Sequence, residues 1–163
     1  IAAVFHTEPP LSAAEQRGGF QAALSGALDD SFNMEVVQAV HEQLLDKIEQ
    51  HKESKDPEPL TVSVQEVAAI LKDCGVADTQ VAAFEAQCGA QFGDGAVLNP
   101  ENIIDSKHFE VKTSDASVAI DPKRSYIVES RIIDGQKYLL IPADEGVEVN
   151  GMAVGIAAAD GRA

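Results

Sequence analysis

The sequence predicts an α+β fold in which helices come first and an antiparallel sheet follows. Apolar residues recur at helical spacing in the first half of the chain, and two capping-box motifs mark helix starts there. From Phe109 onward apolar and polar residues alternate, with Asp-Gly and Asn-Gly pairs between the alternating segments. The apolar face of such a sheet needs a cover, so we expect N-terminal helices packed on a C-terminal hairpin meander.

The first expected helix spans residues 11–28. Ser12 and Glu15 have the spacing of a capping box, in which each side chain bonds to the backbone of the other residue. Three apolar residues share one side: Phe20, Leu24 and Leu28. The pair Gly18-Gly19 weakens the helix, because an interior glycine costs about 1 kcal/mol relative to alanine. We therefore expect this helix to depend on tertiary packing.

The second expected helix is capped by Asn33 and has the most regular apolar stripe of the chain. That stripe consists of Met34, Val37, His41, Leu44 and Ile48. It ends in the polar stretch 51–59, where Pro57 and Pro59 make a stiff connector. We place residues 1–56 in one helical segment and expect it to continue a longer parent chain, since no initiator methionine is present.

Residues 61–156 form the second expected region, a helical hairpin followed by the β-meander. Ser63 and Glu66 make a second capping box for a helix that ends at Cys74-Gly75, and Asp78 is expected to cap the next helix. The first of these helices runs through Val67, Ile70 and Leu71, and the second carries Val81, Phe84, Ala86 and Cys88 before Gly89 and Gly93. Residues 157–163 are small or polar and are expected to fray.

The meander centres on Asp134-Gly135, which predicts a two-residue type I′ turn with φ > 0 at both positions. In that register Ile132 lies opposite Lys137 and Ser130 opposite Leu139. One face then holds Tyr126, Val128, Ile132, Leu139 and Ile141, and the other holds Glu129, Arg131, Gln136 and Tyr138. Asn150-Gly151 predicts a second turn, and Asp144-Glu145-Gly146 a turn between strands. We expect the strand at Tyr126 to follow a turn at Asp121-Pro122.

The charge argues against two classes of partner. The net charge is −15, and residues 61–106 contain seven acids but only one base, Lys72. Such a surface repels phosphate, so we expect no nucleic-acid and no membrane partner. No apolar run approaches the roughly 18 residues of a membrane span. Cys74 and Cys88 fit neither a paired metal motif nor a disulfide framework, which indicates reduced thiols and a cytoplasmic protein.

Several long stretches together resemble one family. They are residues 5–10, 36–44, 51–53, 57–60, 109–112 and 144–151. These stretches are similar to the C-terminal portion of an uncharacterised bacterial family, domain of unknown function 4317, over nearly all of the chain up to about Val154. The resemblance implies a fragment of a longer bacterial protein. It implies no activity, cofactor or catalytic residue.

Two segments begin like metal motifs but lack essential ligands. Residues 41–45 start like the zinc signature H-E-x-x-H, yet Leu45 stands where the second histidine belongs. We therefore expect His41 to be a core residue and not a metal ligand, and His6, His51 and His108 fall in different expected elements. Residues 94–101 resemble the second half of a calcium-binding EF-hand loop, but the first half offers no side-chain oxygens at two ligand positions. Neither segment supports a metal site.

Residues 67–84 could form a helix-turn-helix, but their acidity argues against DNA contact. The sequence shows no phosphate loop, nucleophile elbow or dinucleotide fingerprint, so catalytic residues stay unknown and no cofactor or metal is expected.

The leading hypothesis is a non-catalytic structural or protein-interaction region, with protein partners or self-association. The alternatives are part of a hydrolase-like enzyme completed by a missing N-terminal region, or a small-ligand-binding regulatory domain with a pocket between sheet and helices. Whether the chain is an enzyme stays open.

Overall fold

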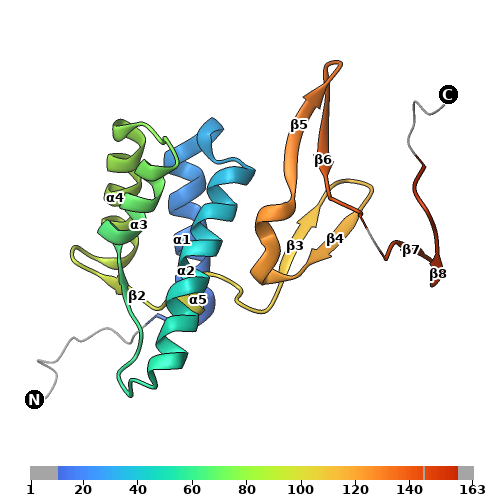
Figure 1. Ribbon diagram of the computed structural model, residues 1–163. Coiled ribbons are helices and arrows are strands. Elements are labelled where there is room, and N and C mark those ends of the chain that lie inside the picture. The colour runs from blue at the N-terminus through green and yellow to red at the C-terminus, as the bar shows by residue number, and fades with distance from the viewer. Residues whose placement is uncertain (1–10, 145, 158–163) are drawn as a thin grey trace, which may run out of the picture. The chain divides into compact units, whose positions relative to one another are not determined.

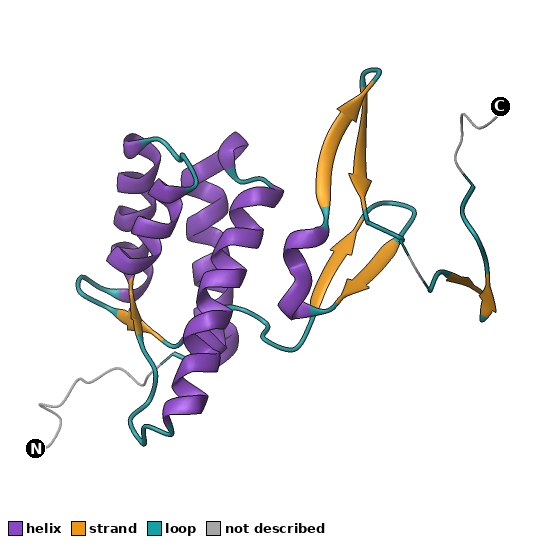
Figure 2. Ribbon diagram, in the orientation of Figure 1, coloured by secondary structure: helices purple, strands orange, loops and turns teal. Residues whose placement is uncertain are grey.

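The structure, a computed structural model, describes residues 11–144 and 146–157 of the 163-residue chain. The α+β class is confirmed, with helices first and small antiparallel hairpins after them (Figures 1 and 2). The chain divides into two compact units, Ile1–Tyr126 and Ile127–Ala163. This boundary lies far from the connector at residues 51–59, and each unit is described by itself.

The first unit contains the helices, an antiparallel pair of two-residue strands that lie far apart in the sequence, and one short hairpin (Figure 1). Its helical elements are α1 (Ala13–Leu28), the 3-10 helix η2 (Asp29–Ser31), α2 (Met34–Ser54), α3 (Val64–Asp73), α4 (Asp78–Phe92) and α5 (Pro100–Ile103). Its strands are β1 (Val62–Ser63), β2 (Val97–Leu98), β3 (Phe109–Lys112) and β4 (Ser117–Ile120). β1 pairs with β2 and β3 with β4, both antiparallel.

The helix starts follow the predicted capping chemistry in three of four cases. Both capping boxes form, at α1 and at α3, and the Asn33 side chain accepts a hydrogen bond from the Val36 amide at the start of α2. The prediction for Asp78 is wrong, because the N-cap of α4 is Ala77 and Asp78 is the first helical residue. An acid there still interacts favourably with the helix dipole, which explains its presence without a cap.

Close packing of α1 on α4 forms the centre of the first unit. The rings of Phe20 and Phe84 meet edge to face, with centroids 6.1 Å apart, and both side chains are buried. A Cβ on Gly19 would lie 2.9 Å from the Phe92 ring, and one on Gly26 would lie 2.8 Å from the Gln87 side chain. The two glycines therefore let the helices approach, which gives the weak α1 the tertiary support that the sequence predicts.

The buried side of α2 is rotated relative to the predicted stripe. Its buried residues are Val36, Val40, His41, Leu44, Leu45 and Ile48, whereas Val37 is 37 % exposed. α2 also continues to Ser54, so His51 is helical and does not belong to the connector. The helix ends where Lys55 adopts the left-handed conformation, and the His51 ring contacts the Glu58 carbonyl oxygen at 2.7 Å.

Helix and sheet meet within the first unit at the β3–β4 hairpin. Phe109 pairs with Ile120 across the strands and both are buried. The Phe109 ring lies 4.9 Å from the His41 ring of α2, measured between centroids. The chain then forms the 3-10 helix η3 (Pro122–Ile127), so the expected strand at Tyr126 is absent and the next strand begins at Glu129.

The described part of the second unit contains two hairpins, and both turns occur where the sequence predicts them. β5 (Glu129–Ile133) pairs with β6 (Gln136–Leu140), and β7 (Glu148–Val149) pairs with β8 (Met152–Ala153). The predicted partners of β5 and β6 are confirmed, with Ile132 opposite Lys137 and Ser130 opposite Leu139. Positive φ angles occur at Asp134 (51°), Gly135 (81°), Asn150 (51°) and Gly151 (81°). Gly146 also has positive φ, but Glu145 in that expected turn lies outside the described residues.

The expected continuous meander is wrong, because each hairpin is a separate two-stranded sheet. The face expected to be covered is also largely exposed, with Ile132 at 71 %, Leu139 at 37 % and Ile141 at 43 %. The opposite face of β5 and β6 carries Ile133, Tyr138 and Leu140 beside its charged residues. With apolar side chains on both faces, this hairpin lacks the clean alternation that the prediction assumed.

Adjacent glycines in α1 offer a matched test of the helix contact. No atom of the described residues lies within 4 Å of a Cβ placed on Gly18, so Gly18→Ala should stabilise the fold by about 0.5–1 kcal/mol through helix propensity. Gly19→Ala gains the same propensity but presses on the Phe92 ring, so its free energy of unfolding should be lower than that of Gly18→Ala. Urea melts measure both. Equal stabilisation would show that α1 and α4 are not held this close.

The β5–β6 turn offers a second test. Gly135 sits at φ 81°, where a Cβ is unfavourable by roughly 1 kcal/mol or more. Gly135→Val should therefore weaken the cross-strand nuclear Overhauser effects between Ser130 and Leu139, while Gln136→Thr beside the turn should preserve them. The hairpin belongs to the second unit and not to the helical one. We therefore choose NMR of these strands, which reports a change in the hairpin itself. If both variants keep these cross-strand effects at equal strength, the turn with positive φ at Gly135 is wrong.

Candidate functional site

A pocket of about 230 Å³ lies in the first unit between α1, α2, α5 and the start of β3. Its apolar wall includes Phe20, Leu24, Phe32, Val40, Ile103 and Phe109. Polar side chains from three segments join this wall: Arg17, Gln21, His41, Asp105, His108 and Glu110. An apolar cavity with a few polar groups is the usual form of a small-molecule site.

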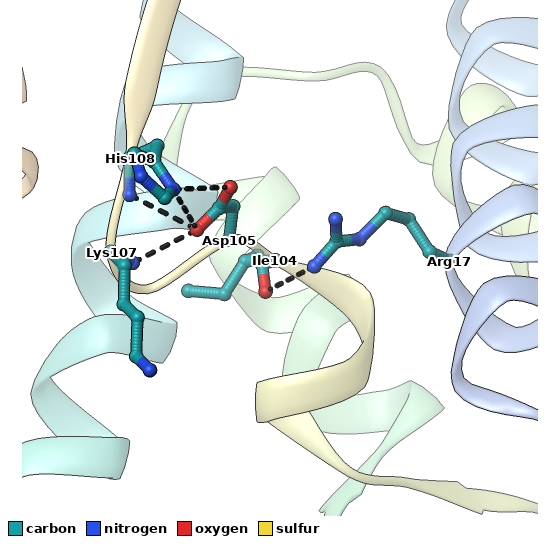
Figure 3. A network of polar contacts seen from close by, with 5 residues as sticks. All are labelled: Arg17, Ile104, Asp105, Lys107 and His108. Atoms are coloured by element: carbon teal, nitrogen blue, oxygen red, sulfur yellow. Dashed lines mark hydrogen bonds and ion pairs between the residues drawn. The ribbon is translucent and has the colours of Figure 1, made fainter.

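Arg17 is the cation of this site. It lies three residues before Phe20 and seven before Leu24, so helical spacing places all three on one side of α1. Its Nη2 donates a hydrogen bond to the Ile104 carbonyl oxygen at 3.0 Å (Figure 3). The side chain is half-buried and forms no ion pair with any residue that the structure describes. Toward the described residues, the guanidinium thus uses one of its five N–H donors.

Asp105 organises the backbone between α5 and β3. One carboxylate oxygen accepts hydrogen bonds from the Lys107 amide at 2.9 Å and the His108 amide at 3.0 Å. The other lies 3.1 Å from His108 Nδ1 (Figure 3). Burial raises the pKa of Asp105, but the hydrogen bonds from Lys107 and His108 outweigh it and hold that pKa below its ordinary value of 3.8. Asp105 is therefore ionised at neutral pH.

His41 is buried, with 6 % of its surface exposed, as the sequence predicts. Its Nε2 lies 3.3 Å from the Pro122 carbonyl oxygen. A carbonyl oxygen can only accept, so we assign the proton to Nε2. Burial lowers the pKa of His41 below its ordinary value of 6.5, against the opposing effect of the Pro122 hydrogen bond. The ring is therefore neutral at pH 7, with Nδ1 as an acceptor.

The histidines of the described chain do not gather into a ligand cluster. His51 lies near the end of α2 and contacts Glu58, while His108 follows α5. His6 lies outside the described residues. Within residues 11–144 and 146–157, no group of three or more histidine, cysteine, aspartate or glutamate side chains could hold a metal ion. The segment 94–101, weighed as half a calcium loop, holds β2 and the start of α5.

The Asp105–His108 pair has the form of a base and its orienting carboxylate, as in hydrolytic sites. However, the His108 side chain is 77 % exposed, and no described serine, threonine or cysteine hydrogen-bonds to it. Burial, and then the charge of Glu85, raise the pKa of Cys88 to about 11, so its thiol is protonated at pH 7. The described residues thus pair no nucleophile with this histidine.

A second feature is the concentration of exposed apolar side chains in the β-hairpins of the second unit. They are Ile132, Ile133, Tyr138, Leu139, Ile141, Val149, Met152, Val154 and Ile156. Isolated exposed apolar residues are normal on protein surfaces, whereas large contiguous apolar patches are typical of contact sites. This surface is distinct from the pocket, because it belongs to a different unit.

Sequence reasoning missed the pocket and the role of Arg17. One signal was available, since Arg17 is the only arginine in the first 106 residues and occurs one turn before a buried phenylalanine. The spacing of Asp105 and His108 also fits an aspartate that caps the amides after it. The contact between Arg17 and Ile104 spans 87 residues, and no local pattern predicts it.

The fold and the site define an acidic α+β domain with a small pocket in its helical unit. The chain belongs to the family described as a domain of unknown function (DUF4317), whose family model matches residues 1–152. The resemblance inferred from the sequence is thereby confirmed. No curated protein and no solved structure matched the chain. Among the described residues, no helix combines the length and apolar character needed to cross a membrane.

The buried His41 predicts a specific pH dependence of stability. Its pKa in the folded chain is below the ordinary value of 6.5, so below that pH the unfolded chain binds a proton first and the free energy of unfolding falls. The slope is at most about 1.4 kcal/mol per pH unit. In His41→Gln, which can still donate to Pro122, the loss between pH 7.5 and 5.5 should be smaller than in the wild type. Urea melts at both pH values measure it.

The prediction is tested by the difference in pH dependence between the wild type and His41→Gln, because the other ionisable groups are the same in both proteins. Identical pH dependences would contradict the desolvation of His41.

Proposed function

We propose that this chain is a non-catalytic protein-interaction region whose contact element is the β5–β6 hairpin, and that the hairpin binds a second copy of the chain. The single observation that carries this proposal is the exposed apolar surface of the hairpin, with Ile132 at 71 % and Leu139 at 37 % exposure on the same face. A lone two-stranded hairpin is marginally stable in water. Burial of this face against another protein surface would stabilise it.

Charge supports a second copy as the partner. The chain has a net charge of −15, so contact between most of its surfaces brings like charges together. Residues 129–140 are different, because two acids, Glu129 and Asp134, balance two bases, Arg131 and Lys137. Two such hairpins can meet about a two-fold axis without adding net charge to the interface.

We further infer a cytoplasmic setting, supported by two cysteines that are both free thiols. The acidity also weighs against nucleic acid as a partner. The hydrolase-like alternative has less support, since the described residues pair no nucleophile with His108. The small-ligand alternative is favoured by a specific observation, the pocket beside Arg17.

Sedimentation velocity over a range of concentrations tests the proposed contact. The wild-type chain should shift from monomer to dimer in the micromolar range, and Ile132→Asp should weaken the dimer at least tenfold, because it places a charge in the contact. Val97→Asp is the matched control, since Val97 is 56 % exposed in the other unit, and it should leave the dissociation constant within about twofold. A wild-type chain that stays monomeric, or equal effects of the two substitutions, would sink the proposal.

A further inference from the structure

We propose that the pocket between α1, α2, α5 and β3 binds a small aromatic monocarboxylate, with its carboxylate on Arg17 and its ring among the phenylalanines. This inference is independent of the self-association through β5 and β6, because it rests on other residues in the other unit.

The first argument is the state of the Arg17 guanidinium. A guanidinium has five N–H donors, and the contact with the Ile104 carbonyl oxygen is the one hydrogen bond that Arg17 makes with described residues. In a chain with 27 acids and 12 lysines and arginines, a half-buried arginine that forms no ion pair with any described acid stands out. A carboxylate would fit the remaining donors, since its two oxygens match the fork of the guanidinium.

The second argument is the aromatic and apolar character of the pocket wall. Phe20, Phe32 and Phe109 line the pocket together with Leu24, Val40 and Ile103. Aromatic rings prefer offset or edge-to-face contact with one another, and such contact adds to the gain from apolar burial. Pockets of about 300–1,000 Å³ enclose drug-sized ligands, so the 230 Å³ here suits a ligand of roughly ten non-hydrogen atoms. One ring with a short acid arm has this size.

The two acidic side chains that line the pocket do not occupy the place proposed for the ligand's carboxylate. Asp105 directs one carboxylate oxygen to the amides of Lys107 and His108 and the other to the His108 ring. Glu110 accepts a hydrogen bond from the Ser117 hydroxyl at 2.8 Å and lies 3.7 Å from Lys112 Nζ. Both carboxylates are thus engaged on the β3 side, whereas Arg17 projects from α1. A ligand carboxylate bound at Arg17 therefore contacts the guanidinium and not these two acids.

A titration of the whole chain with phenylacetate, followed by 1H–15N NMR, tests the proposal. The amides of Arg17, Gln21 and Ile104 should shift in a saturable manner, with a dissociation constant in the millimolar range or below. Two ligands of nearly the same shape separate charge from apolar contact. Phenylacetamide, which is neutral, and phenethylamine, which is cationic, should each bind at least tenfold more weakly.

Three variants assign the contact to this pocket. Arg17→Gln, which removes the guanidinium charge and keeps a polar side chain, should weaken phenylacetate binding about tenfold or more. Val37→Glu should also weaken it, because Val37 lines the pocket and is 37 % exposed, so the new carboxylate repels the ligand without disturbing the core. Lys72→Gln, an exposed cation of α3 outside the pocket lining, removes the same charge elsewhere and should leave the affinity within twofold.

The amide spectrum of each variant without ligand shows whether its fold is intact, and Val37→Glu keeps the test decisive if Arg17→Gln disturbs α1. Absence of saturable shifts at 20 mM phenylacetate would overturn the proposal. Equal binding of phenethylamine, or an unchanged affinity in a folded Arg17→Gln chain, would do so as well, since either result shows that Arg17 does not select the ligand.

Discussion

The close approach of α1 to α4 is the constraint on which the helical unit depends. Two missing side chains, at Gly19 and Gly26, leave the space that Phe92 and Gln87 occupy. At this separation Phe20 reaches the ring of Phe84 in the core. The rotation of α1 that satisfies this contact also directs Arg17 toward α5, where it holds the Ile104 carbonyl oxygen. Core packing and pocket geometry therefore have one origin.

Features encoded by neighbouring residues could be predicted from the sequence. The capping boxes of Ser12 and Ser63 and the turn at Asp134-Gly135 each involve residues at most three positions apart. Their chemistry is local, so a pattern identifies them. Asp78 shows the limit of this reasoning, since a good capping residue at a helix start can occupy the first helical position instead of the cap.

Features that depend on distant partners could not be predicted. The turn at Asp134-Gly135 predicts that β5 pairs with β6, but alternation says nothing about whether one hairpin pairs with the next, and the hairpins are separate sheets. Val37 fits an apolar stripe as well as Val36 does, yet only Val36 is buried, because the neighbours of α2 decide which side is covered. The pocket escaped prediction for the same reason, since it joins residues of α1 to residues near position 105.

The order of packing partners along the chain has a consequence for synthesis. α1 ends at Leu28, whereas its main partners, α4 and α5, begin at Asp78 and Pro100. At about 5–20 residues per second, roughly 3–13 s pass between the translation of Leu28 and that of Phe92, the last residue of α4. During this interval the main packing partners of Phe20, Leu24 and Leu28 are not yet made, and Gly18 and Gly19 weaken α1 as an isolated helix. The nascent chain thus presents an apolar segment of the kind that chaperones bind, until α4 is made.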